Sequence, residues 1–318
     1  MQVACNRRAR VPEPSRLRWP RLSAPWLIVC ASFLFATMGV CVKLASTQYA
    51  AGELVFYRSV IGTLMVAGLV RLRGGRLATT LPSMHFWRSL SGVISLCLWF
   101  YSLAALPLAT SMTLNYMSSI WMALFLLGGG AMLGSARIDS RLIATILLGF
   151  AGVAMILRPT IEQQQLWYGL AGLLSGMIAA TAYLQVAALG RAGEPEYRIV
   201  FYFSLGGVVA GALMTLWTGF SPHTLRGVLL LLGVGVLSTV AQMMMTRAYS
   251  TGSPLVNASL QYLGIAFSYG YGVLLFADRI TGMALAGMAL IVVAGLSATV
   301  LRARAAPPEL AKHPPETA

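Results

Sequence analysis

The hydrophobic positions of this 318-residue chain fall into long runs that are separated by short polar segments. A helix needs about 20 mainly apolar residues to cross a bilayer, so runs of this length predict membrane spans. The charge-free stretch from Ser89 to Ala136 is too long for one span, and Pro107 divides it because proline opens a helix better than it continues one. Ten spans are predicted, at residues 25–45, 51–70, 88–106, 109–133, 141–158, 166–189, 198–218, 227–248, 253–276 and 281–301.

Composition supports an all-α membrane protein. Hydrophobic residues make up 58% of the chain and charged residues only 10%, whereas soluble domains carry roughly 25% charged residues. A chain this apolar cannot cover a water-exposed surface with polar groups, so soluble classes are excluded and the lipid bilayer is the expected surrounding.

The net charge of +14 is that of many nucleic-acid-binding proteins, but the arginines lie in short clusters between apolar runs. That distribution is typical of the positive-inside rule, and no nucleic-acid partner is expected. With the N-terminus inside, 17 positive residues lie in cytoplasmic segments, Arg88 among them, and three lie outside. We expect a multi-pass protein of the inner membrane with both termini cytoplasmic, and with disorder in the basic leader (residues 1–24) and in the tail (residues 303–318).

The two halves of the chain repeat each other. Short matches recur in the same order at offsets of 142 to 146 residues, which predicts five-helix units at residues 25–158 and 166–302. Because five is odd, the second unit starts on the opposite side of the membrane, and such inverted repeats are common in secondary transporters. The matching segments are Val55–Ser59 with Val200–Ser204, Leu114–Tyr116 with Leu260–Tyr262, Arg137–Ile138 with Arg279–Ile280, and Ala151–Gly152 with Ala294–Gly295.

Several short motifs, in this order and spacing, resemble the EamA-type family of the drug/metabolite transporter superfamily. One departure is Gly134-Ser135, where the family pattern has an acidic residue after the fourth helix. The resemblance covers most of residues 27–302 and implies ten helices in two inverted halves that transport small organic metabolites. The motifs are Phe56-Tyr57-Arg58, Tyr101-Ser102-Leu103, Leu106-Pro107-Leu108-Ala109, Gly149-Phe150-Ala151-Gly152-Val153, Arg247-Ala248-Tyr249 and Pro254-Leu255.

The expected function is secondary transport of a small polar or zwitterionic organic metabolite by alternating access. Export of an amino acid or related compound is the direction that the resemblance implies; uptake of a vitamin or nucleoside-like metabolite is the alternative within transport. A membrane-embedded enzyme or a non-transporting scaffold is the alternative of another class. No phosphate-binding loop with a lysine and no HExxH motif is present, so no enzyme, cofactor or metal is expected. The protein is expected to act as a monomer or homodimer.

Arg58 is the first candidate for the substrate site because a charge inside an apolar span costs about 2.5–3.5 kcal/mol on insertion scales. Arg58 either faces a cavity, where it pairs with a substrate carboxylate or with Glu53, or extends its side chain to the membrane surface. The other acidic residues avoid mid-membrane positions, which favours facilitated diffusion or exchange over proton coupling.

Two polar stripes supply the other candidates. Asn115 and Ser119 share a helix face with Ser111, and Asn257 and Gln261 lie on a comparable stripe in the second half. They either line one central cavity or bond neighbouring helices to each other. Tyr116 and Tyr262, beside the two amides, either stack on a flat ligand or anchor packing, and Tyr183 is a further candidate.

Overall fold

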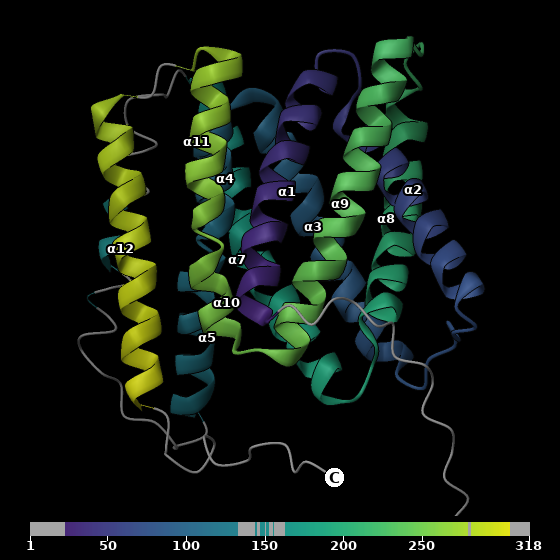
Figure 1. Ribbon diagram of the computed structural model, residues 1–318. Coiled ribbons are helices and arrows are strands. Elements are labelled where there is room, and N and C mark those ends of the chain that lie inside the picture. Colours follow the sequence, from purple (N-terminus) through teal and green to yellow (C-terminus); the bar gives the residue numbers. More distant parts are fainter. Residues whose placement is uncertain are drawn as a thin grey trace, which may run out of the picture.

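The computed structural model describes residues 23–132, 144, 147–149, 151–152, 155, 163–278 and 281–305, and all regular structure in them is helical (Figure 1). The helices are α1 (Ala24–Ala45), α2 (Ala51–Leu72), α3 (Pro82–Ala105), α4 (Leu108–Tyr116), α5 (Ser118–Met132), α7 (Gln163–Arg191), α8 (Glu196–Thr218), α9 (Leu225–Thr251), α10 (Pro254–Leu260), α11 (Leu263–Phe276) and α12 (Gly282–Ala305).

Six of these helices, α1, α2, α3, α7, α8 and α9, are long and apolar enough to cross a membrane. Each covers one predicted span and extends it by at most a few residues, apart from α3. The division at Pro107 is confirmed: Leu106 is extended, and α4 begins directly after the proline. The predicted span 141–158 lies largely outside the described residues, as do the leader and most of the tail.

Each of the predicted spans 109–133 and 253–276 holds two helices in the structure. The first is divided into α4 and α5 at Met117, and the second into α10 and α11 at Gln261 and Tyr262. At each break the helical hydrogen bonds tighten to a three-residue step: Ile120 N donates to Met117 O (2.9 Å) and Gly264 N donates to Gln261 O (2.8 Å). Such tightened turns interrupt the regular ladder without a proline, so hydropathy does not reveal them.

The third span also differs from its prediction. α3 begins at Pro82 instead of residue 88, which places Arg88 in the second turn of the helix. Proline at the first helical position was the available signal. The apolar run alone missed it because His85 and Arg88 interrupt the hydrophobic pattern.

The helices pack in pairs that each join one helix of the first half to one of the second: α2 lies along α8, α1 along α9, and α3 along α7 (Figure 1). α11 and α4 also contact each other, so elements of both halves meet throughout the bundle. Large apolar side chains cover the outer surface, for example Leu72, Trp217 (92% exposed) and Leu274. This exposed apolar surface is appropriate to lipid and not to water.

Polar contacts join the two halves at both ends of the bundle. At one end the Glu53 carboxylate accepts hydrogen bonds from Ser221 N (2.9 Å) and Ser221 Oγ (2.6 Å). At the same end Lys43 Nζ lies 3.2 Å from Asp278 Oδ2, which also accepts a hydrogen bond from Leu108 N at the start of α4.

At the opposite end Glu194, between α7 and α8, accepts hydrogen bonds from Thr79 (2.7 Å) and Arg198 (2.8 Å). Burial raises the pKa of the Glu194 carboxyl, but these two hydrogen bonds and the charges of Arg198 and His85 outweigh it, so the pKa lies below its ordinary value. Glu194 is therefore ionised at neutral pH and ties the loop before α3 to the start of α8.

Candidate substrate site

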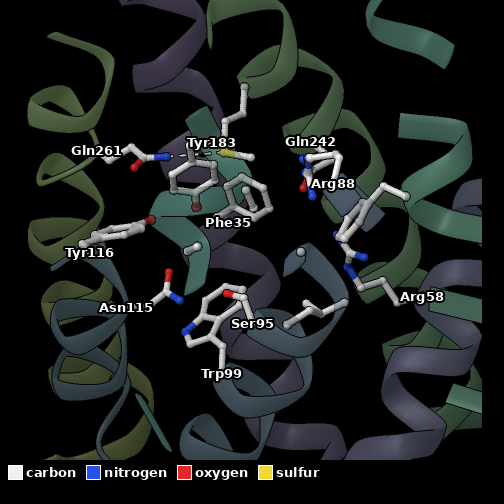
Figure 2. Close-up of a pocket in the computed structure, with 16 residues that line it drawn as sticks. Phe35, Arg58, Arg88, Ser95, Trp99, Asn115, Tyr116, Tyr183, Gln242 and Gln261 are labelled. Atoms are coloured by element: carbon white, nitrogen blue, oxygen red, sulfur yellow. Dashed lines mark hydrogen bonds between the residues drawn. The ribbon is translucent and has the colours of Figure 1, made fainter. Parts of the chain in front are cut away.

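A cavity lies inside the bundle, where α1, α2, α3, α4, α7, α8 and α9 meet the α10–α11 junction (Figure 2). Its volume is about 60 Å³, which holds a few water molecules, whereas small-molecule sites typically have roughly 300–1,000 Å³. The cavity is thus smaller than a typical small-molecule site. It is lined by Phe35, Arg58, Arg88, Gly92, Ser95, Leu96, Trp99, Asn115, Tyr116, Ala179, Ala182, Tyr183, Phe203, Gln242, Met245 and Gln261.

Asn115 lies near the C-terminal end of α4, one residue before Tyr116 and the break at Met117. Its Nδ2 donates to Ser175 Oγ on α7 (2.9 Å), and Ser95 Oγ donates to the Ser175 carbonyl (2.9 Å). α7 and α4 approach this closely because residue 176 is glycine: a Cβ there would lie 2.6 Å from the Leu114 carbonyl oxygen. These contacts fix Asn115 at the cavity wall.

Gln261 has weaker partners than Asn115. Its Oε1 accepts from Tyr249 OH at 3.3 Å, and its Nε2 is 3.3 Å from Met245 Sδ (Figure 2). Thioether sulfur is a weak acceptor, and buried Tyr116 OH has no hydrogen-bond partner among the described residues. Tyr183 stacks on Tyr249, with ring centroids 4.9 Å apart. This side of the cavity therefore retains hydrogen-bonding capacity for a ligand.

The other side carries two arginines. Arg58 comes from α2 and Arg88 from α3, and both guanidinium groups face the ring of Phe203 on α8. Arg58 is buried and does not extend its side chain to the membrane surface. Glu53 binds Ser221, and no ion pair joins Glu53 to Arg58 within the described part of the chain. Arg88 is a charged site residue that the sequence prediction missed, since it was counted among the positive residues of the cytoplasmic segments. The aromatic lining residues Phe35, Trp99 and Phe203 were missed as well.

The structure thus places Arg58, Asn115, Tyr116, Tyr183 and Gln261 on one cavity, and three other predicted residues elsewhere. The hydroxyls of Ser119 and Tyr262 are hydrogen-bonded to each other and join α5 to the α10–α11 junction.

Asn257 Nδ2 donates to the Ala248 carbonyl (2.6 Å) and connects α10 to α9. These contacts are those of side chains that bond helices together. Within the described residues no group of three His, Cys, Asp or Glu side chains is arranged to hold a metal ion.

The fold defines a multi-pass membrane protein with a partly open cavity between its helices, whose mainly apolar wall carries a few polar groups. A family model, the EamA-like transporter family, matches residues 22–158. The chain is 37% identical over 269 residues to the pseudopaline exporter CntI of Pseudomonas aeruginosa, and the matched region covers 84% of this chain and 93% of the exporter. The chain belongs to the EamA-like transporter family, and its homologues are transporters of the drug/metabolite type. It is therefore a transporter and not an enzyme.

A second relative is a riboflavin transporter of Rhizobium johnstonii, 26% identical over 294 residues, with 92% of this chain and 94% of the relative covered. One solved crystal structure superposes with a TM-score of 0.65 at 19% identity, over 88% of this chain and 98% of the other. At that identity the match shows a shared fold.

Proposed function

We propose that this protein exports a small polar or zwitterionic organic metabolite by alternating access, and that the central cavity is its binding site. The observation that carries the proposal is the lining itself: aromatic, amide and guanidinium groups from both halves of the chain converge on one cavity. Pockets with a mostly apolar wall and a few convergent polar groups are typical of small-molecule sites. The similarity to a pseudopaline exporter favours export as the direction.

We further propose that residues 25–158 and 166–302 are inverted five-helix repeats, giving ten membrane-spanning segments. The helix contacts support this, because α1 with α9 and α3 with α7 become equivalent when the halves are exchanged, and α2 with α8 exchanges with itself. The breaks at Met117 and at Gln261–Tyr262 fall within two residues of matching positions. Discontinuous helices near the midplane are a recurring feature of transporter binding sites.

We propose the orientation of the protein in the membrane from the distribution of its positive residues. The end of the bundle that holds Arg71, Arg76, Arg191 and Arg198 carries more positive residues than the end that holds Lys43, so the positive-inside rule assigns it to the cytoplasm of the inner membrane. The termini, with the leader 1–24 and the tail 303–318, are then both cytoplasmic.

Uptake of a vitamin or nucleoside-like compound is the second candidate. Phe35, Trp99 and Tyr183 give the cavity flat aromatic walls, and one relative is a riboflavin transporter.

Comparison of intracellular and extracellular metabolites in deletion and overproduction strains tests both directions. Export requires a compound that rises outside on overproduction and accumulates inside on deletion. The opposite pattern would establish uptake, and an unchanged profile across growth media would contradict transport of a soluble metabolite.

Ala182→Leu tests the cavity itself, because the added carbons would fill a space of about 60 Å³. We expect this variant to reach the membrane and to lose the metabolite change. Val209→Leu, on an exposed position of α8, should leave it intact.

A further inference from the structure

Two buried arginines share one aromatic ring in the cavity. The guanidinium carbons of Arg58 and Arg88 lie 5.2 and 4.5 Å from the centre of the Phe203 ring. Their residues are only 4% and 2% exposed. Figure 2 shows them on the opposite side of the cavity from Asn115 and Tyr116. The site therefore has a cationic side and an amide-and-phenol side.

No acidic side chain of the described residues forms an ion pair with either arginine. Arg58 Nε, Arg88 Nε and Arg88 Nη1 are buried without a hydrogen-bond partner in the described part of the chain. Among the described residues that line the cavity, none carries a carboxylate. The acids of the described residues are engaged elsewhere: Glu53 with Ser221, Glu194 with Arg198, Glu196 with Arg247, and Asp278 with Lys43.

Burying two like charges within a membrane protein is costly, and such residues mark substrate or ion pathways. The contact with the Phe203 ring compensates part of this cost, because a guanidinium is attracted to the face of an aromatic ring. It leaves the N–H groups unsatisfied. A guanidinium presents a rigid planar fork of donors that matches a carboxylate with two parallel hydrogen bonds.

Gly92 makes the position of Arg88 possible. A Cβ at residue 92 would collide with Arg88 Nη1 and would lie 2.9 Å from Phe203 Cε2. The guanidinium occupies the space that a side chain at the next turn of α3 would take. The absence of a side chain at residue 92 thus leaves room for Arg88 over the ring at the cavity wall.

We propose that Arg58 and Arg88 bind two carboxylates of the transported compound, so that the substrate is an organic dicarboxylate anion. Asn115, Gln261 and Tyr116 then contact its remaining polar groups. This inference deepens the proposed function by naming the substrate class of the same cavity, and it rests on that function.

The test is a binding assay on the purified full-length protein, in which binding is measured as the shift of the apparent melting temperature. The probes are dicarboxylates from malonate to adipate, each compared with its diamide at equal ionic strength, and inorganic phosphate. We expect at least one dicarboxylate to stabilise the protein, its diamide to have no effect, and phosphate to have less. Arg58→Gln and Arg88→Gln should each weaken the affinity roughly 30-fold or more, the loss typical of a buried charge partner.

Arg71→Gln, at an exposed position of the same helix as Arg58, is the matched control and should bind as the wild type does. The melting temperature measured without ligand separates a binding role of the arginines from a structural one. Without ligand, Arg58→Gln and Arg88→Gln should melt no lower than the wild type, because each removes an unpaired buried charge. A structural arginine would lower the melting temperature when replaced.

The proposal is overturned if no dicarboxylate shifts the melting temperature, if a diamide or phosphate shifts it equally, or if the two variants respond as the wild type does. An exported metabolite without acidic groups would refute this inference while leaving the proposed function standing. Dicarboxylate binding without any metabolite change in cells would do the reverse.

Discussion

Substitution of Gly176 by alanine tests whether the close approach of α7 to α4 shapes the site. The added Cβ would lie 2.6 Å from the Leu114 carbonyl oxygen and 2.8 Å from the Asn115 carbonyl oxygen. These are backbone atoms, so no rotamer change relieves the contact, and α7 and α4 must separate by about 0.5 Å in a close-packed interior. Overpacking of this kind typically costs about 1–3 kcal/mol.

The separation also lengthens the hydrogen bond from Asn115 to Ser175, so Gly176→Ala should perturb the cavity as well as stability. The assay is the apparent melting temperature of the purified protein, which we expect to fall by several degrees, since 1 kcal/mol corresponds to roughly 2–4 °C in domains of 150–250 residues.

Gly270→Ala on α11 is the matched control. A Cβ there meets nothing within 4 Å, and alanine is favoured over glycine inside a helix by about 0.5–1 kcal/mol. This variant should be as stable as the wild type or more so. If Gly176→Ala were equally stable, the tight crossing of α7 and α4 would not be a determinant of the fold.

Three further predictions concern contacts away from the cavity. The pKa of Glu194 is lowered in the folded protein, so its ionised form stabilises the fold above the ordinary carboxyl pKa, and this contribution is lost as pH falls through the lowered value. Glu194→Gln should therefore flatten the decline of the melting temperature on acidification. An unchanged dependence of the melting temperature on pH would contradict this. Asp278→Ala should destabilise the protein more than Lys43→Ala, because Asp278 also accepts a hydrogen bond from Leu108 N at the start of α4; the reverse ranking would refute this role of Asp278. A double-mutant cycle should give a coupling energy below about 1 kcal/mol for the partly exposed Lys43–Asp278 pair. Tyr262→Phe should lower the melting temperature, because Tyr262 bonds Ser119 outside the cavity, and should leave ligand affinity unchanged, whereas altered affinity would place Tyr262 in the site.

Much of the helical organisation was predictable because membrane spans are marked by length and hydropathy. The boundaries of α1, α2, α7, α8 and α9 follow the apolar runs closely. The breaks at Met117 and at Gln261–Tyr262 were not predictable in this way, since a tightened turn needs no change in hydropathy.

The candidate site was predictable in part. Arg58 stood out as a charge in an apolar run, and Asn115 and Gln261 as matched amides. Arg88 was missed because a charge near a span boundary is most simply explained as a loop residue. Ser119 and Asn257 share helix faces with cavity residues, but hydroxyl and amide groups also bond neighbouring helices, and sequence spacing does not distinguish the two uses.

The small volume of the cavity bears on how affinity is measured at the proposed site. Under the proposed function, a site of about 60 Å³ has to expand before a metabolite enters, so ligand would bind only the fraction of molecules whose helices have separated. The apparent dissociation constant then equals the intrinsic one divided by that fraction. A substitution that merely favours the expanded state would therefore tighten apparent binding without any new contact. Affinity and transport rate must be measured together, because a gain in the first alone reports the population of open molecules.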